Sequence, residues 1–273
     1  MRFAFVVSSG LGYQIPNLFK TENSFEEFDQ ALEYLRENDF DGVELNLHFD
    51  DELKLSKIRK SIHDSKLKLA AVGTGLVYGQ EKLSFTNSNQ NERTRALSIV
   101  KRLLEFASSE NASLIIGSVR GRTETKDAPT QLRDCLIECD AAAKRQGTRI
   151  ALEAINRYET NFLNNADEVS AFIETSKLSS TGILLDTFHM NIEEQSIEET
   201  IRGNKSKLIH FHIADSNRWP PGYGHLRIED SLHLLRDLNY DGWVSAETLP
   251  KPNNIEAVKA TAKFLKAHNF MGT

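Results

Sequence analysis

The chain has 273 residues, of which 40% are hydrophobic and 26% are charged, as in an ordinary globular protein. Its 33 Lys and Arg residues against 39 Asp and Glu residues give a formal net charge of −6, and no basic run is present, which argues against binding to nucleic acid. No run of 18 or more apolar residues occurs, so the sequence predicts no membrane span.

Short runs rich in apolar and β-branched residues recur along the chain and predict buried strands. The apolar part of the first run, residues 3–7, is too short for the hydrophobic segment of a signal peptide. The runs are 3–8, 42–47, 67–73, 113–117, 148–153, 182–186, 208–212 and 243–247.

A longer stretch with helical periodicity follows each run. The stretch 24–38 opens with Ser24 and Glu27, which have the spacing of a capping box, and the stretch 89–109 is the longest. Cys135 and Cys139 lie four residues apart in another such stretch and are expected to share one helix face. Two cysteines are too few for a disulfide framework, so we expect a reduced, cytoplasmic protein.

Strict alternation of strands and helices predicts βαβ units with parallel strands. The mean repeat of about 34 residues suits a closed (β/α)8 TIM barrel. No linker or shift in composition divides the chain, so we expect a single domain over residues 1–273. The alternative is a doubly wound open sheet, but no GxGxxG motif follows the first predicted strand, where a dinucleotide-binding fold would carry it.

The last four predicted strands each end on a side chain that can bind a metal ion, namely Glu153, Asp186, His212 and Glu247. The carboxyl ends of barrel strands converge on the face that carries active sites, so we expect these side chains to face one point. Three carboxylates and one imidazole favour Mn²⁺, Mg²⁺ or Co²⁺, and Zn²⁺ is also compatible. His210 lies one layer deeper on the same face as His212 and is a candidate partner of a metal ligand.

The segments around these residues resemble the ketose 3-epimerase group of the xylose-isomerase-like TIM-barrel superfamily. This group includes the D-tagatose and D-psicose 3-epimerases and the 5-keto-L-gluconate epimerases. The segments that carry the resemblance are ALEAINRYET, GILLDTFHMNIEE, LIHFHIADSNRWPPGYGH and WVSAE. The intervals of 33, 26 and 35 residues between the four metal-ligand types (153 to 186, 186 to 212, 212 to 247) are similar to those of the group's metal site. The resemblance is strongest over about residues 150–250.

The resemblance implies that the four strand-end residues hold one divalent metal ion and that Glu153 and Glu247 form the catalytic acid/base pair. It also implies that Glu159, His189 and Arg218 bind the oxygen atoms of a sugar. The implied reaction is epimerisation through an enediolate, in which one carboxylate removes a carbon-bound proton and the other returns a proton on the opposite face. The group's members imply a homo-dimer or homo-tetramer.

Four arginines follow predicted strand ends on the same face, namely Arg120, Arg122, Arg157 and Arg218. A guanidinium can bind a carboxylate or a phosphate through two hydrogen bonds, so these residues predict an anionic substrate. The motifs RGR, NRYET and SNRWPPG most resemble the 5-keto-L-gluconate epimerase branch. We therefore expect an acidic keto-sugar of the 5-keto-gluconate or tagaturonate type, although a sugar phosphate would also satisfy the arginines.

Three other functions stay open. An aldose–ketose isomerase of the hydroxypyruvate isomerase type would use the same enediol chemistry at a different carbon. A non-catalytic sugar-binding barrel would not need a carboxylate on each side of its ligand. An apurinic endonuclease of the same superfamily would share the Asp186-x-x-His189 pattern and Glu247, but it would need further histidines after the third and fourth strands, which end VGTG and IIGSVRG.

Overall fold

The computed structural model describes residues 1–272, and it contains all eight predicted strands, each within two residues of its expected bounds. Their interiors are almost entirely buried, which explains why they read as continuous apolar runs. The strands are β1 (Arg2–Ser8), β3 (Gly42–Asn46), β4 (Lys68–Gly73), β5 (Ser113–Ile116), β6 (Ile150–Glu153), β7 (Thr181–Asp186), β8 (Leu208–Ile213) and β9 (Trp243–Ala246).

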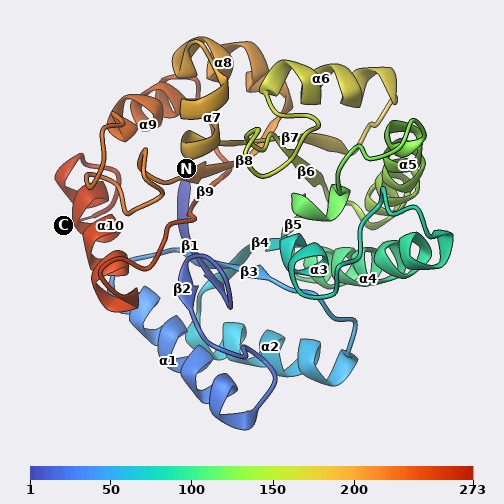
Figure 1. Cartoon of the computed structure of the whole chain (residues 1–273). Coiled ribbons are helices and arrows are strands. Elements are labelled where there is room, and N and C mark those ends of the chain that lie inside the picture. The colour runs from blue at the N-terminus through green and yellow to red at the C-terminus, as the bar shows by residue number, and fades with distance from the viewer. Residues whose placement is uncertain (273) are drawn as a thin grey trace.

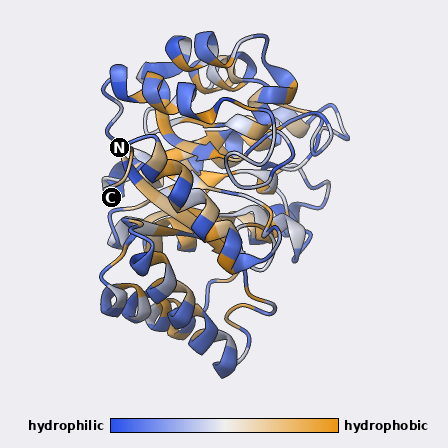
Figure 2. Ribbon diagram, turned by 90° about the vertical axis from the view of Figure 1, so that its left-hand side faces the viewer, coloured by the Kyte–Doolittle hydropathy of each residue, from blue (hydrophilic) through white to orange (hydrophobic). Residues whose placement is uncertain are grey.

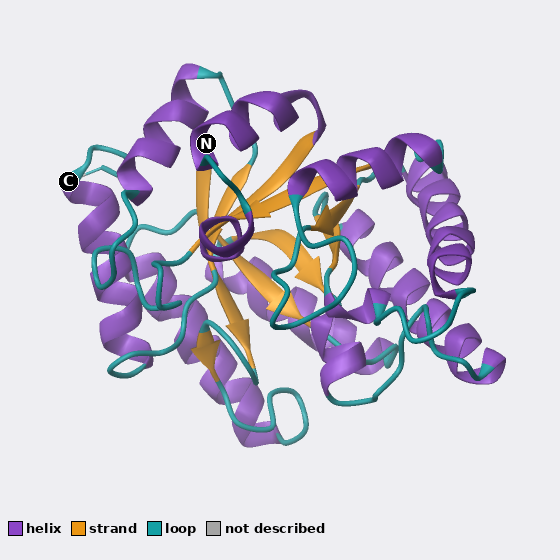
Figure 3. Ribbon diagram, turned by 45° about the horizontal axis from the view of Figure 1, so that its top comes forward, coloured by secondary structure: helices purple, strands orange, loops and turns teal. Residues whose placement is uncertain are grey.

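These strands form a closed parallel barrel. Each strand pairs with the next, and β9 pairs back with β1, where Trp243 lies opposite Arg2. A two-residue strand, β2 (Tyr13–Gln14), pairs with the carboxyl end of β1 outside the ring of eight strands. Figures 1 and 3 show the strands at the centre of a ring of helices. The (β/α)8 prediction is confirmed, and the open doubly wound sheet is wrong.

One outer helix of 8 to 20 residues follows each barrel strand and covers the barrel from outside. These helices are α1 (Glu22–Glu37), α2 (Glu52–Ser65), α4 (Gln90–Ser109), α5 (Ala128–Gln146), α6 (Ala166–Thr175), α8 (Ile197–Asn204), α9 (Ile228–Asp237) and α10 (Asn254–Ala267). Hydrophobic residues gather on the strands and on the helix sides facing them (Figure 2). Cys135 and Cys139 are both buried, unpaired residues of α5. Among the residues described, no helix has the length and apolar character needed to cross a bilayer.

Short elements occupy the loops at the carboxyl ends of the barrel strands. They are helix α3 (Gly75–Gly79) after β4, a 3-10 turn (Ser118–Arg120) after β5 and helix α7 (Thr187–Glu193) after β7. A second 3-10 turn (Lys205–Lys207) leads into β8. These short helices therefore lie next to the strand-end residues that point toward the barrel axis.

The start of α1 differs from the prediction. Thr21 is the N-cap, its hydroxyl accepts from the N–H of Ser24 at 3.2 Å, and the Ser24 hydroxyl accepts from the N–H of Thr21 at 3.2 Å. The expected pairing of Ser24 with Glu27 is therefore wrong, because Ser24 is the second member of the box and not the first. Both pairs have the same spacing of three, so spacing alone could not separate them.

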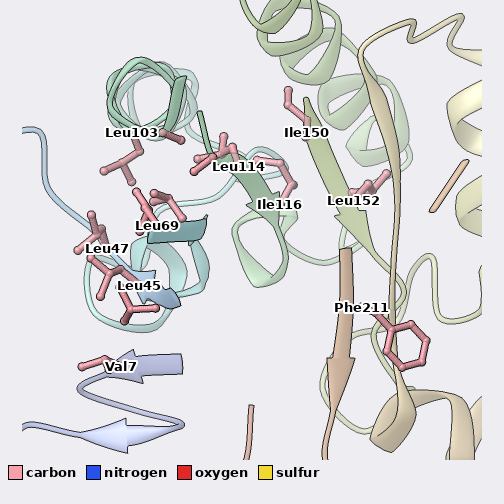
Figure 4. Packing of buried hydrophobic residues seen from close by; sticks show 14 of the residues in the cluster. Val7, Leu45, Leu47, Leu69, Leu103, Leu114, Ile116, Ile150, Leu152 and Phe211 are labelled. Atoms are coloured by element: carbon pink, nitrogen blue, oxygen red, sulfur yellow. The ribbon is translucent and has the colours of Figure 1, made fainter. Parts of the chain in front are cut away.

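Side chains along the strands point alternately out of and into the barrel, which gives two packing regions. Outward side chains of the strands pack against the helices, as Leu69 and Leu114 do beside Leu103 of α4 (Figure 4). Inside the barrel, a separate apolar cluster forms a floor. It consists of Ala71, Ile115, Ala151 and Leu184, with Ile209 packed against it. The next inward positions along these strands lie above this floor, where the polar site begins.

Candidate metal and active site

A cavity of about 160 Å³ opens at the carboxyl ends of the barrel strands. Its walls come mainly from small or apolar residues of β1, β4, β5 and their loops, such as Ser8, Leu11, Gly75 and Leu76. Most of its ionisable lining comes from β6 to β9 and the loops that follow them. The acidic, basic and imidazole side chains that line it are Glu44, Glu153, Glu159, His189, His212, Arg218 and Glu247.

The structure brings together the four strand-end residues predicted to bind a metal. Glu153 and Asp186 end β6 and β7, His212 lies near the end of β8, and Glu247 follows β9 directly. All four are buried, and one potential ligand atom from each lies within 4.8 Å of the others. This cluster could hold one metal ion.

Two buried atoms in this cluster lack a hydrogen-bond partner. Asp186 caps α7 through Oδ1, which accepts from the N–H of Phe188 at 2.8 Å, but its Oδ2 has no partner. His212 Nδ1 also has none, and it lies 3.9 Å from that Oδ2. Buried polar atoms are rarely left unpaired. A divalent cation between them would satisfy both, so the donor set fits a metal ion.

Glu44 on β3 supports this cluster from below, and the strand-end reasoning missed it. Its Oε2 lies 2.8 Å from His210 Nε2 and its Oε1 lies 3.1 Å from His212 Nε2. Burial alone would raise the pKa of Glu44, but the charges and hydrogen bonds of the two imidazoles bring it below its usual range. An ionised carboxylate only accepts hydrogen bonds, so His212 donates from Nε2 and turns Nδ1 toward the cluster. The available signal was a carboxylate between two apolar residues, Val43 and Leu45, of a predicted strand.

Arg218 lies across the cluster, and the pKa values of the two glutamates shift in opposite directions. Its Nη2 pairs with Glu247 and lies 3.6 Å from Asp186 Oδ2. Burial alone would raise the pKa of Glu247, but Arg218 and then His212 lower it. Burial and the nearby Glu247 charge raise the pKa of Glu153. In the metal-free site one glutamate is therefore held ionised while the other retains its proton more readily, as in acid/base pairs.

His189 and Glu159 also lie at the cavity, as the resemblance implied. His189 is the third residue of α7, and its Nε2 is 3.6 Å from Glu153 Oε1. Burial, followed by the nearby positive charge of Arg218, lowers the pKa of His189 well below its usual value. Glu159 Oε1 is 3.9 Å from Arg218 Nη1. These polar groups surround the space above the metal cluster.

Three of the four arginines predicted to bind an anionic substrate do not line the cavity. Arg120 is fully buried, and its guanidinium donates to the backbone carbonyls of Gly117, Leu163 and Glu153. It thereby anchors the end of β6 from behind, and burial lowers its pKa to about 10. The expectation that it faces the substrate is corrected by this placement.

The other two arginines brace the loop that follows β6. Arg122 Nη1 donates to the backbone carbonyl of Glu159 at 2.9 Å. Arg157 is exposed and pairs with Glu193 at 2.8 Å. Their sequence positions place them on the correct face of the barrel, but their side chains are already engaged in holding the loop. Only Arg218 remains of the predicted anion-binding set among the described residues lining the cavity.

Known proteins that are similar to this chain share its barrel fold. The chain matches the xylose isomerase-like TIM barrel family over residues 32–268. A 3-dehydro-D-guloside 4-epimerase of Escherichia coli (strain K12) is 29% identical over 245 residues, which cover 84% of this chain and 88% of the relative. A D-psicose 3-epimerase of Agrobacterium fabrum is 30% identical over 240 residues, covering 82% and 80%. A crystal structure of D-psicose 3-epimerase with D-tagatose from Clostridium cellulolyticum H10 has a TM-score of 0.78 at 20% identity and covers 99% of both chains, which supports the fold.

Proposed function

Because the chain belongs to the xylose isomerase-like TIM barrel family, we propose that it is a sugar epimerase that inverts the carbon next to the carbonyl of a keto sugar. The relatives named as a 3-dehydro-D-guloside 4-epimerase and a D-psicose 3-epimerase both carry out such a reaction. The enzyme class is therefore an isomerase acting on carbohydrates. The observation that carries the proposal is that Glu153 and Glu247 lie at the cavity, in one buried cluster of residues that could bind a metal ion.

Inversion next to a carbonyl requires removal of a proton on one face and its return on the other. Glu153 ends β6 and Glu247 directly follows β9, so a substrate held between them would meet a carboxylate on each side. One carboxylate takes the carbon-bound proton, the electron pair moves onto the carbonyl oxygen as an enediolate, and the other carboxyl group returns a proton. The roles exchange in the reverse direction.

Stabilisation of the negative charge on the enediolate must supply much of the rate enhancement. General acid/base catalysis contributes about 10²–10⁴-fold, whereas enzymes usually reach at least about 10⁶-fold. When bound, a divalent metal ion stabilises negative charge on the substrate oxygens as a Lewis acid. His189 and Arg218 add fixed hydrogen-bond donors to those oxygens. The ligand set of three carboxylates and one imidazole favours Mn²⁺, Mg²⁺ or Co²⁺ and is compatible with Zn²⁺.

The charge of the cavity supports a neutral substrate over the acidic keto-sugar predicted from the arginines. Four carboxylates line the cavity, from Glu44, Glu153, Glu159 and Glu247, and Arg218 is already paired with the last of these. A substrate carboxylate or phosphate would therefore find no guanidinium free to pair with it among the described residues that line the cavity. We therefore propose a ketose or keto-glycoside without an ionised group.

Deuterium exchange tests both the reaction and the substrate class. Metal-loaded protein is incubated in D₂O with neutral ketoses, 3-keto-glycosides, keto-acids and ketose phosphates, and the label is followed by NMR. We expect deuterium at the carbon beside the ketone, together with the epimer, and the highest kcat/KM for a neutral substrate. Glu153→Gln and Glu247→Gln should each lose at least about 10²-fold in kcat.

A matched control is Arg157→Gln, which removes a surface ion pair outside the cavity and should retain activity. Label at C1 or C2 with an aldose as product would identify an aldose–ketose isomerase instead. A higher kcat/KM for keto-acids would restore the acidic substrate, and exchange with none of the substrates would overturn the two-glutamate mechanism.

A further inference from the structure

The side-chain amide of Asn156, in the loop after β6, has its orientation fixed by two neighbours. Its Oδ1 accepts from the N–H of Tyr158 at 2.9 Å, and its Nδ2 donates to Glu159 Oε1 at 3.2 Å. The reversed amide would set Nδ2 against an N–H donor and Oδ1 against a carboxylate oxygen. Both contacts would be repulsive, so the hydrogen-bond network assigns the oxygen and the nitrogen of this amide.

The same amide nitrogen faces the ring of His189. Asn156 Nδ2 lies 2.7 Å from His189 Nδ1, and the backbone N–H of Asn156 points to the same ring nitrogen at 3.4 Å. A ring nitrogen that faces two donors must accept with its lone pair. His189 Nδ1 therefore carries no proton, which excludes the imidazolium and leaves the tautomer with its proton on Nε2.

The Nε2–H of His189 then has no acceptor at hydrogen-bond distance in the part of the chain that the structure describes. Glu153 Oε1 lies 3.6 Å away and Asp186 Oδ2 lies 4.0 Å away. Arg218 Nη1, a donor 3.3 Å from Nε2, competes for the one lone pair of the neutral ring, but Nδ1 faces two donors, the nearer at 2.7 Å, so the lone pair is assigned to Nδ1. The ring is buried and lines the cavity, so this donor is available to a ligand oxygen.

We propose that Asn156 is a positioning residue that locks His189 in the Nε2–H tautomer and so presents a neutral hydrogen-bond donor to the substrate. A neutral imidazole can stabilise a developing oxyanion by donating a hydrogen bond without giving up its proton to the intermediate. The role assigned to the donor rests on the proposed function, whereas the tautomer itself does not. Asn156 acts only through His189 and does not touch the reacting atoms.

Two substitutions at this position separate tautomer control from support of the loop. Asn156→Asp keeps the size and the acceptor for Tyr158, but it turns a carboxylate oxygen toward His189 Nδ1 and forces a proton onto that nitrogen. Like the Ala variant, it also loses the hydrogen bond to Glu159. Asn156→Ala loses the side-chain contacts but leaves the backbone N–H facing Nδ1. Tautomer control predicts that the Asp variant loses about 10²-fold in kcat and that the Ala variant loses less. A purely structural role predicts the opposite order.

The tautomer is read directly from ¹⁵N NMR of histidine-labelled, Mg²⁺-loaded protein, with the His189 signals assigned by their loss in His189→Gln. We expect an unprotonated Nδ1 and a protonated Nε2 in the wild type, and a protonated Nδ1 in Asn156→Asp. A protonated Nδ1 in the wild type would overturn the proposal, even if neither variant folds.

Calorimetric titration with Mg²⁺ controls for the charge that Asp introduces near the metal cluster. The kcat comparison is made at metal concentrations that saturate each variant. An Asp variant with wild-type kcat, or with a greater kcat than the Ala variant, would contradict positioning by Asn156. The expected tautomer together with no deuterium exchange on any sugar would instead overturn the proposed function and leave the tautomer assignment in place.

Discussion

Glu44 is a residue whose effect on the metal site can be tested without touching a proposed ligand. Its two oxygens accept from His210 and His212, which fixes the ring of His212 with Nδ1 toward the cluster. Glu44→Gln keeps the shape but replaces one acceptor oxygen with a donor group. Loss of such support around a ligand typically costs 10- to 100-fold in metal affinity, so we expect the Kd for Mn²⁺ to rise by about that factor.

Isothermal titration with Mn²⁺ measures this change. Glu198→Gln is a suitable control, because Glu198 pairs with Arg202 on the exposed side of α8, and its Kd should stay at the wild-type value. An unchanged Kd in Glu44→Gln would show that His212 is oriented by its strand alone.

Among single residues, the sequence predicted the site residues that end strands. It missed those whose role depends on which distant side chains or backbone groups they contact. Glu153 and Asp186 stood out because each terminates an apolar run. Glu44 lies two residues before the end of its strand, and no local pattern indicates that it pairs with histidines more than 160 positions away. Arg120 shows the converse, since its position after β5 gave the correct barrel face but not the direction of its long side chain.

The hydroxyl group of Thr187 links the start of α7 to Ala214, the residue that follows β8. Thr187 Oγ1 donates to the carbonyl of Ala214 at 2.7 Å and accepts from the N–H of Ala214 at 2.9 Å, and both residues are buried. Thr187→Val has the same shape but leaves both backbone groups without this partner. We expect the free energy of unfolding to fall by about 1–3 kcal/mol for each buried group left unpaired.

Urea unfolding of the metal-free protein measures this loss. Thr187→Ser retains the hydroxyl and should be the more stable of the two variants. Equal stability of the Val and Ser variants would mean that neighbouring groups or water replace the lost hydrogen bonds.

The elements themselves were predictable where they are long and regular. Parallel barrel strands are buried on both faces, so each appears as an uninterrupted apolar run. The loop elements β2, α3 and α7 contain two, five and seven residues, too few to produce a periodic pattern. These unpredicted loop elements matter for the site, because α7 carries His189 and begins at the cap formed by Asp186.

The closed barrel as a whole brings distant positions into one charge cluster. Glu44 and His210 are 166 positions apart, and the pairing of β9 with β1 completes the ring that sets β3 across from β8. Closure also concentrates like charges, since Glu153, Asp186 and Glu247 are buried together. Without a cation this arrangement opposes folding, so metal binding and stability are coupled in this molecule.

This coupling should depend on pH in a defined direction. In the metal-free protein, burial and Glu247 raise the pKa of Glu153 above its value in the unfolded chain. Between these two pKa values the folded state holds more protons than the unfolded state, so the stability of the metal-free protein falls as pH rises. A metal ion binds the deprotonated carboxylate, so its affinity rises over the same interval.

We therefore expect the increase in Tm on adding Mn²⁺ to chelator-treated protein to be larger at about pH 8 than at about pH 6, because ligand stabilisation grows with the ratio of metal concentration to Kd. Differential scanning calorimetry at both pH values, with and without the metal, measures the two increases. In Glu153→Gln the side chain cannot titrate, and the contribution of Glu153 to the difference between them should disappear. An equal or larger increase at about pH 6 in the wild type would mean that Glu153 is already ionised before the metal binds, and that Arg218 offsets the repulsion within the cluster at both pH values.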